Sequence, residues 1–290
     1  MNTFWPIGTL GIIVFTVYWS YQGFKDPRFT DKYMLIPIRI LRDKENYRLI
    51  SSGFLHANWL HLILNMVSLY FFGADVESGV GLLTFLVIYL GSIVGGYLLS
   101  LYLHRYDDYR ALGASGGVCG ILFASIFLFP GSTMLLFPLP IPIPSWLYAI
   151  LFIVVSFFGM RNRWGNIGYD AHLGGAIIGL LITTVLRPSI VLASPVLYLA
   201  VLGISAGLFF YLYKSPRYKG TANPFSLTYW RHTWAQTQAR AKARQEKLDD
   251  ETMNRLLAKI SQSGMDSLTA SELKQLEAIS KRMRESGRVH

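Results

Sequence analysis

Ser115, His172, His61 and Asn65 are polar residues in apolar surroundings, and their types suit acyl transfer. Ser115 lies within "GASGG" and His172 within "AHLGG", each at the start of an apolar segment. His61 and Asn65 are four residues apart in "HLILN", which places both side chains on one face of a helix. A serine becomes a nucleophile when a histidine takes its proton, and further polar groups can stabilise the oxyanion that forms.

The same residues also have a structural interpretation. Small residues such as Gly113 and Gly116 let membrane helices approach closely, so packing alone is the simpler explanation of Ser115. His61 and Asn65 could equally bridge two helices by hydrogen bonds. However, a serine at a helix N-terminus lies beside free backbone amides and the positive end of the helix dipole, which suit an anionic intermediate. Taken one at a time, these residues leave both interpretations open.

A glycine stripe predicts which segments meet. Gly175 and Gly179 are four residues apart and form a close-packing face on the segment that begins near His172. We expect this face to pack against the glycine-rich start of the segment that contains Ser115, which would bring His172 close to the serine. Asp170, two residues before His172, points elsewhere on a helix. We expect it to be a surface or loop carboxylate, with an orienting role for His172 as the lesser alternative.

The elements that carry these residues read as membrane helices. The chain has 290 residues, of which 52% are hydrophobic and only 15% charged, unlike an ordinary soluble domain. Apolar segments near the roughly 20 residues needed to cross a bilayer recur along it. They comprise residues 4–23, 59–76, 80–103, 115–130, 145–160, 168–186 and 191–213. The sequence therefore predicts an all-α fold, a polytopic membrane helix bundle.

The remaining composition narrows the class of protein further. The net charge of +10 resides mainly in loops that flank the membrane and in the tail, so topology and anionic lipid explain it without nucleic acid. The first segment lacks a basic region before it and a cleavage site, so we expect it to be retained. Cys119 is the single cysteine, which excludes an intramolecular disulfide. No metal or nucleotide motif is apparent.

Two connecting segments and the tail have their own patterns. Residues 24–58 form a basic loop whose centre, "YMLIPIRIL", we expect to lie in the membrane interface. Residues 137–144 alternate proline with aliphatic residues, which predicts an extended connector. From residue 214 onward the chain is polar, with fifteen basic and eight acidic residues. We expect a basic linker and helix over 214–250.

The last part, 251–290, predicts two short amphipathic helices around residues 264–268. Thr269 and Glu272 have the spacing of a capping box at the start of the second helix. A hairpin of this size buries little core, so it suits docking to a protein or to anionic lipid better than catalysis.

Three motifs together resemble a known family. "HANWLHLILN", "GASGG" and "AHLGGAIIG" occur in this order on the second, fourth and sixth apolar segments, as in the rhomboid intramembrane serine proteases. The resemblance covers roughly residues 45–187, and Arg48, Glu77 with Gly79, and "YLGSIVGG" are also similar to the family pattern. It implies a six-helix core over residues 1–187, followed by an extra seventh helix over 188–213 and a small soluble helical tail.

The resemblance also implies a role for each site residue. Ser115 matches the nucleophile and His172 the general base of a dyad that cleaves transmembrane protein substrates within the lipid bilayer. His61 and Asn65, with the Ser115 backbone amide, match the oxyanion-stabilising groups. His56 matches the outer histidine of its motif, whose role is more structural. The family requires neither metal nor cofactor.

The sequence departs from the family pattern at Cys119, and its C-terminal part resembles one group within the family. The position four residues after the serine, often an aromatic residue packed on the catalytic histidine, is Cys119, so something else must orient His172. The seventh helix and helical tail resemble rhomboids of the Bacteroidetes group, which implies a bacterial cytoplasmic membrane.

The charges of the loops disagree with the orientation that the family implies. Eleven basic residues lie in the loops after the first, third and fifth segments, whereas the other loops hold only Arg187. The positive-inside rule then places the first loop on the cytoplasmic side, whereas the family implies the reverse. Whether the seventh segment crosses the membrane or lies flat decides where the tail is placed.

Three classes of function remain to be compared. An active intramembrane serine endopeptidase is favoured because serine, histidine and oxyanion residues are all present. The alternative is a catalytically inactive rhomboid-like protein that binds membrane clients, although such relatives usually lack the serine or the histidine. A transporter would show internal repeats or charged residues in mid-span, and neither is evident in the sequence.

Overall fold

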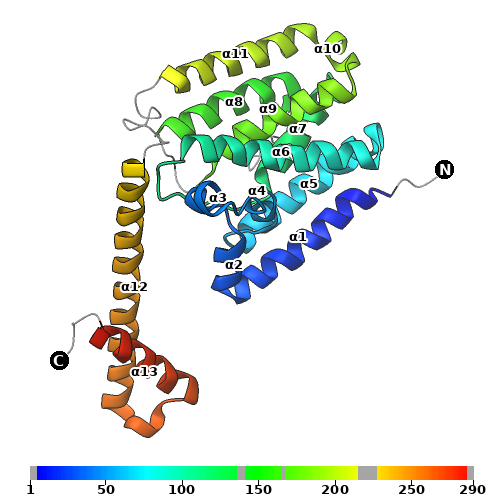
Figure 1. Cartoon of the computed structure of the whole chain (residues 1–290). Helices are drawn as coiled ribbons and strands as arrows, with labels where there is room; N and C mark the ends of the chain where they lie inside the picture. Colours follow the sequence, from blue (N-terminus) through cyan, green and yellow to red (C-terminus); the bar gives the residue numbers. More distant parts are fainter. Residues whose placement is uncertain (1–4, 136–140, 163, 165–166, 215–226, 286–290) are drawn as a thin grey trace. The chain divides into compact units, whose positions relative to one another are not determined.

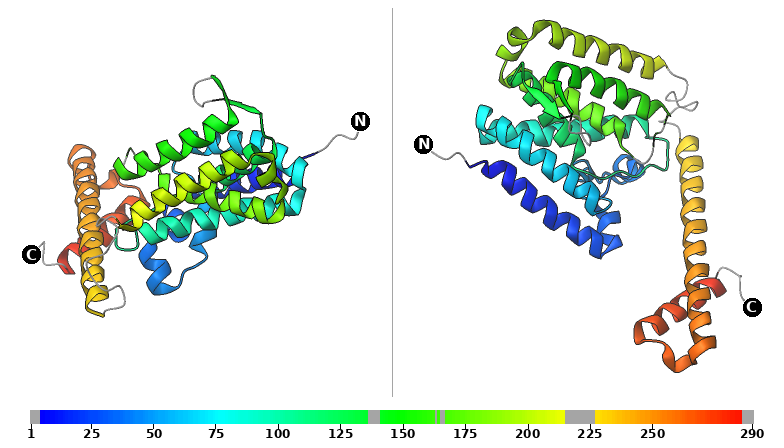
Figure 2. Two further views of the ribbon diagram at one scale, coloured as in Figure 1. Left: turned by 90° about the horizontal axis from the view of Figure 1, so that it is seen from above. Right: turned by 180° about the vertical axis from the view of Figure 1, so that it is seen from behind.

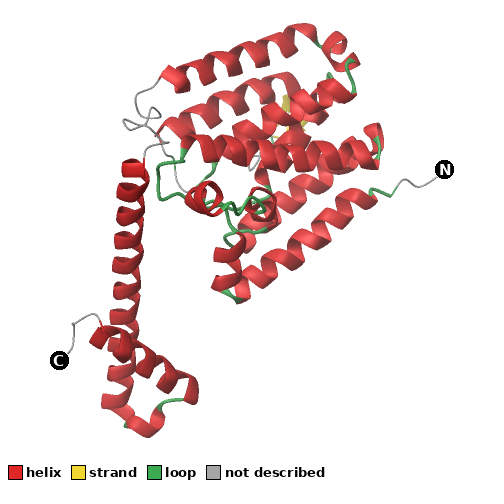
Figure 3. Ribbon diagram, in the orientation of Figure 1, coloured by secondary structure: helices red, strands yellow, loops and turns green. Residues whose placement is uncertain are grey.

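The computed structural model describes residues 5–135, 141–162, 164, 167–214 and 227–285. They divide into two compact units, Met1–Gly220 and Thr221–His290. The described part of the first unit is almost entirely helical, with one pair of short strands (Figure 3). Its long helices are α1 (Ile7–Lys25), α5 (Trp59–Val80), α6 (Leu82–Leu103), α7 (Ser115–Leu128), α8 (Ser145–Asn162), α9 (Tyr169–Leu186) and α11 (Pro195–Lys214).

Each of the seven predicted apolar segments overlaps one of these helices. Five of them, α5, α6, α8, α9 and α11, are long and apolar enough to cross a membrane. α7 is a shorter apolar helix of 14 residues. α1 packs on α5, where the buried Glu77 carboxylate accepts hydrogen bonds from the backbone N–H groups of Gly8 and Thr9 at 2.8 Å. The predicted polytopic helix bundle is confirmed.

α7 is the central helix of the bundle. Every residue from Gly116 to Phe127 is buried, and α5, α6, α8 and α9 all contact it (Figures 1 and 2). At about 1.5 Å per residue, α7 is about 21 Å long, shorter than the roughly 30 Å of hydrocarbon in a bilayer. A helix of this length is too short to span the hydrocarbon layer on its own.

Glycines allow α6, α7 and α9 to approach until their backbones touch. A Cβ atom at Gly175 would collide with the Gly116 carbonyl, and one at Gly179 with the Gly120 backbone. From α6, a Cβ atom at Gly96 would lie 2.5 Å from the Ala171 carbonyl oxygen of α9. The glycine stripe on α9 therefore packs against the glycine-rich start of α7, as the sequence predicts.

The first basic loop is more ordered than the sequence suggests. It contains the short helices α2 (Pro27–Tyr33), α3 (Pro37–Asp43) and α4 (Arg48–Ser51), followed by the 3-10 turn η1 (Ser52–Phe54). α2 and α3 each begin with a proline in the first turn, where the missing N–H costs nothing. Leu35, within the segment expected to lie in the interface, is fully buried and pairs with Ala111 in an isolated β-bridge.

The proline-rich connector forms part of a hairpin. β1 (Thr133–Leu135) pairs antiparallel with β2 (Pro142–Pro144), with Met134 opposite Ile143. The extended conformation predicted for residues 137–144 is present in β2, and residues 137–140 lie outside the described residues. After α9, the short helix α10 (Ser189–Ala193) precedes α11.

The second unit differs from the expected arrangement of a linker and two short helices. α12 (Leu227–Ser263) runs for 37 residues without a break, so the boundary predicted at residue 250 falls inside one helix. After Gly264 and the 3-10 turn η2 (Met265–Ser267), α13 (Ala270–Glu285) packs back on it. The predicted capping box is confirmed, because Thr269 N–H donates to Glu272 at 2.8 Å and Glu272 N–H donates to Thr269 Oγ1 at 3.2 Å.

Candidate active site

Ser115 is the first residue of α7 and is half-buried at the start of that helix. Gly113, two residues before Ser115, has φ of +139°, a conformation that L side chains rarely adopt. A Cβ atom at Gly113 would lie 2.9 Å from His61 Cε1 and 3.7 Å from Ser115 Oγ. The absence of a side chain at Gly113 thus leaves the serine hydroxyl and the His61 ring next to the same small space.

The backbone before the serine is fixed from two sides. The Gly113 N–H donates to the Ser52 carbonyl at 3.0 Å, and the Tyr97 hydroxyl donates to the Gly113 carbonyl at 2.9 Å. Tyr97 comes from α6 and Ser52 from η1, so two separate elements set the position of the turn that enters α7.

His61 and Asn65 lie in the first two turns of α5. Asn58 caps this helix by accepting the His61 N–H at 2.9 Å, which sets where the helix begins. The Asn65 amide donates one hydrogen to the His61 carbonyl at 2.9 Å, leaving its second N–H for another acceptor. Of the predicted oxyanion pair, His61 is beside Ser115, and Asn65 is buried one turn deeper.

His56 bridges α1 to the start of α7. The Ser20 hydroxyl donates its one hydrogen to the Phe54 carbonyl at 2.9 Å. The Ser20 oxygen must therefore accept a hydrogen bond from His56 Nδ1–H, which is also 2.9 Å away. His56 Nε2 then accepts the Ala114 N–H at 3.3 Å. Burial, and secondly the nearby His61, lower the pKa of His56 to about 3, so the ring is neutral. The contacts are those of a positioning residue beside the serine.

His172 lies in the first turn of α9, where this helix crosses the start of α7. The adjacent Ala171 carbonyl is 3.3 Å from where a Cβ atom of Gly116 would lie, so the two candidate catalytic residues flank a direct helix contact. Among the described residues, Ser115 and His172 share no hydrogen bond. Catalytic hydrogen bonds often tighten only when substrate binds.

An aromatic ring does lie beside His172, although Cys119 does not supply it. Cys119 is buried in the apolar cluster that includes Ala149 and Leu173. Tyr169, one turn before the histidine, has its ring centroid 6.1 Å from that of His172 in an edge-on arrangement. Gly159 on α8 makes room for the Tyr169 ring. The ring beside His172 thus comes from the helix of the histidine itself.

Asp170 is not the surface carboxylate that we expected. It is 4% exposed and lies in the first turn of α9. His104 Nε2 is 3.4 Å from one carboxylate oxygen, and the Tyr109 hydroxyl is 3.3 Å from each. An ionisable residue within a membrane helix is a functional candidate by default, so its position in an apolar segment was the signal for a role.

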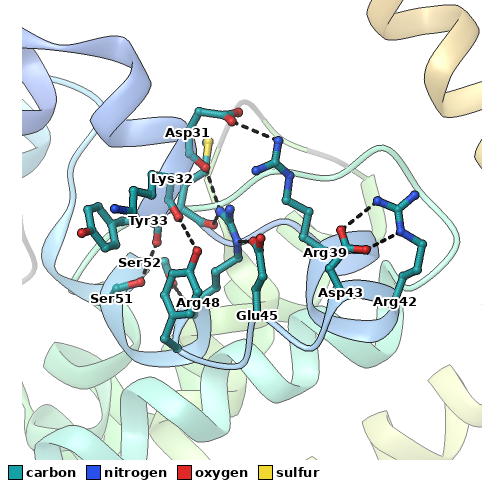
Figure 4. A network of polar contacts seen from close by, with 12 residues as sticks. Asp31, Lys32, Tyr33, Arg39, Arg42, Asp43, Glu45, Arg48, Ser51 and Ser52 are labelled. Atoms are coloured by element: carbon teal, nitrogen blue, oxygen red, sulfur yellow. Dashed lines mark hydrogen bonds and ion pairs between the residues drawn. The ribbon is translucent and has the colours of Figure 1, made fainter.

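Arg48 organises the loop that leads to the first histidine (Figure 4). Its guanidinium is fully buried, donates to Glu45 at 2.5 Å, and donates to the carbonyls of Asp31 and Met34 at 2.7 Å. The Ser52 hydroxyl in turn donates to the backbone carbonyl of Arg48, which links η1 to this network. This network supports η1, whose Ser52 carbonyl receives the Gly113 N–H.

Metal chemistry has no visible ligand set in the described ranges. Within them, no group of three or more His, Cys, Asp or Glu side chains converges in a way that could hold a metal ion. The start of α7 instead carries the Ser115 hydroxyl, with the His61 ring beside it and His56 bound to the Ala114 N–H.

Comparison with known families matches both units of the chain. The Rhomboid domain matches residues 43–189, which include every predicted catalytic and oxyanion residue. Residues 239–282 match a family of unknown function, DUF6576, over a range that begins within α12 and ends within α13.

Several curated proteins are similar to this chain. The mitochondrial Rhomboid protein 1 of Saccharomyces cerevisiae is 35% identical over 176 residues, 59% of this chain and 50% of that protein. The mitochondrial RHOMBOID-like protein 12 of Arabidopsis thaliana is 34% identical over 151 residues, 47% of this chain and 45% of that protein. The rhomboid protease AarA of Providencia stuartii is 28% identical over 149 residues, 46% of this chain and 53% of that protein.

The chain thus spans about half the length of the relatives it matches. Their names place some of them in mitochondria, and others come from bacteria. They support a multi-pass membrane protein and do not support the bacterial cytoplasmic membrane that we expected.

Proposed function

The chain belongs to the rhomboid family, which includes intramembrane proteases, and we propose that this member is a serine endopeptidase with Ser115 as nucleophile and His172 as general base. Its substrates would be transmembrane proteins, cleaved within the bilayer. The observation that carries the proposal is the packing of α9 on the start of α7 at Gly175 and Gly116, which brings the His172 turn to Ser115.

The reaction would proceed through an acyl-enzyme. Ser115 Oγ attacks the scissile carbonyl carbon while His172 accepts the hydroxyl proton. The negative oxygen of the tetrahedral intermediate is stabilised by His61, Asn65 and the Ser115 N–H, which lies at a helix N-terminus without an intrahelical acceptor. His172 then protonates the leaving amine. Water then attacks the ester carbonyl while His172 accepts one of its protons. As the bond to Ser115 Oγ breaks, His172 donates that proton to the serine oxygen, which releases a carboxylic acid and restores the free serine.

Cleavage of a model substrate tests the proposal. The full chain is reconstituted in lipid vesicles with a single-span substrate, and Ser115→Ala and His172→Ala are compared with the wild type. Loss of the nucleophile or the base should lower the cleavage rate by at least about 100-fold. Ser125→Ala is a matched control, since Ser125 lies on the same helix far from its start. Equal cleavage by the wild type and Ser115→Ala would overturn the proposal.

Labelling with a fluorophosphonate separates the protease from a catalytically inactive client-binding protein. An activated serine reacts with this probe, whereas a serine that serves only in packing does not. We expect label on Ser115 of the folded wild type, at a rate reduced in His172→Ala. A folded preparation that cleaves nothing and takes up no label would favour the client-binding role.

A further inference from the structure

Asp170, His104 and Tyr109 form a polar cluster from three different segments of the first unit. Asp170 lies at the start of α9, His104 caps the end of α6, and Tyr109 lies in the segment that leads to α7. Both carboxylate oxygens of Asp170 are 3.3 Å from the Tyr109 hydroxyl, and one is 3.4 Å from His104 Nε2. The dyad and oxyanion groups described above use none of these three residues.

The cluster is rigid because each member is held by more than one contact. The rings of His104 and Tyr109 stack with centroids 3.8 Å apart and planes 6° from parallel. His104 Nδ1 also contacts Asp107 at 3.0 Å. Burial would lower the pKa of His104, but hydrogen bonds and charges from Asp107 and Asp170 outweigh it and raise the pKa to about 9. His104 is therefore a cation that neutralises the buried carboxylate.

Two members of the cluster, Asp170 and Tyr109, lie a few residues before the candidate catalytic residues in the sequence. Asp170 precedes His172 by two residues in the same helical turn. Tyr109 precedes Ser115 by six residues, in a segment already fixed by the bridge between Leu35 and Ala111. The contact between Tyr109 and Asp170 thus ties the segment that enters α7 to the first turn of α9.

We propose that Asp170 is a positioning residue: through Tyr109 and His104 it fixes the first turn of α9, and thereby the His172 ring, relative to Ser115. This inference rests on the proposed protease function. General-base catalysis depends steeply on geometry, and a displacement of about 1 Å can cost about 100-fold in rate. Gly175 and Gly179 hold α9 against α7 along the helices. The cluster fixes the first turn of α9 to the segment that enters α7.

Asp170→Asn tests the proposal because it keeps the shape of the side chain and removes its charge. Turnover and KM for the single-span substrate, and the rate of fluorophosphonate labelling of Ser115, are measured per folded enzyme in lipid vesicles. We expect kcat and the labelling rate to fall by about 10-fold to 100-fold, with KM within about twofold. Tyr109→Phe keeps the ring stacked on His104 and loses only the hydroxyl, so a smaller fall in kcat is expected.

Asp108→Asn is the matched control, because it removes an exposed carboxylate from the residue next to Tyr109. It should leave kcat unchanged. If Asp170→Asn and Tyr109→Phe both lower the melting temperature yet keep the wild-type kcat per folded molecule, the cluster is only structural and the proposal is overturned. A wild type that never cleaves would refute the protease function instead, which distinguishes the two failures.

Discussion

At the scale of single residues, Arg48 illustrates what allows a charged side chain inside this fold. Its guanidinium is fully buried, yet a carboxylate and two carbonyls accept its N–H groups. Arg42, in contrast, pairs with Asp43 at the surface, where its side chain is 44% exposed (Figure 4). Two arginines six residues apart should therefore contribute very differently to the free energy of unfolding.

Replacing Arg48 should cost far more stability than replacing Arg42. Arg48→Ala leaves Glu45 and two carbonyls without their donor, so we expect a loss of about 3–5 kcal/mol. Arg42→Ala removes a solvent-screened pair and should cost no more than about 1 kcal/mol. Denaturation in detergent micelles measures both values. Similar losses for the two variants would contradict the role assigned to the buried network.

The pKa of His104 predicts how stability depends on pH. Because the folded-state pKa of about 9 exceeds the usual 6.5, protonation of His104 stabilises the fold fully below pH 6.5. This contribution, at most about 3 kcal/mol, should disappear as the pH rises from 6.5 through 9. Melting temperatures of the wild type and His104→Gln, measured over this range, should converge at high pH. A constant difference between them would refute the ion pair.

The site residues that the sequence predicts differ in a physical way from the contacts that it could not predict. Ser115, His61 and His172 belong to local motifs, and the glycines beside them reveal the helix contacts that bring them together. The partner of Asp170 is His104, 66 residues away, and no spacing rule links them. The same applies to Tyr97, which holds the Gly113 carbonyl from α6.

At the scale of elements, hydropathy locates the long helices because crossing a membrane requires a continuous apolar segment. The same signal cannot find α2, α3 and α4, which are seven residues long or shorter and depend on contacts such as those of Arg48. The charge and amphipathic patterns of the tail predicted a boundary near residue 250, which falls inside α12. Tyr169 was missed as the ring beside His172 because the expected aromatic position lies on a different helix.

The close contact between α7 and α9 predicts that a methyl group at Gly175 cannot be tolerated. A Cβ atom at Gly175 would meet the backbone of Gly116, which cannot rotate away. We expect Gly175→Ala to destabilise the bundle by about 1–3 kcal/mol or more and to abolish cleavage by separating His172 from Ser115. Circular dichroism melts and the cleavage assay measure the two effects.

Gly203→Ala is the matched control in another membrane helix. Apart from the nearby backbone of α11 itself, no described atom lies within 4 Å of where its Cβ would be, so α11 should tolerate the methyl group. Because alanine favours helix over glycine by about 1 kcal/mol, stability should be unchanged or slightly higher. If Gly175→Ala behaved like Gly203→Ala, close glycine packing would not be what holds the candidate dyad together.

At the scale of the whole molecule, the chain joins a membrane unit to a polar helical unit. Within the second unit, Arg282 makes two hydrogen bonds to Asp249 at 2.8 and 2.9 Å, and Lys259 pairs with Glu272. Leu256 and Ile279 supply its small buried core. α11 is as apolar as the helices of the membrane core, so it can cross the membrane as they do. Whether it crosses decides on which side of the membrane the second unit lies.

An even number of crossings should place residues 26–58 and the C-terminal unit on the same side. α5, α6, α7, α8, α9 and α11 follow one another between these segments, and six crossings return the chain to its starting side. Cysteines introduced by Arg28→Cys and His290→Cys should therefore react with an impermeant maleimide from one side of sealed vesicles. Arg187→Cys, five crossings along, should react from the other side. Buried Cys119 should stay unlabelled and gives the background. Labelling of His290→Cys together with Arg187→Cys would mean that α11 lies in the membrane without crossing it, leaving the basic tail on the opposite side from the basic first loop.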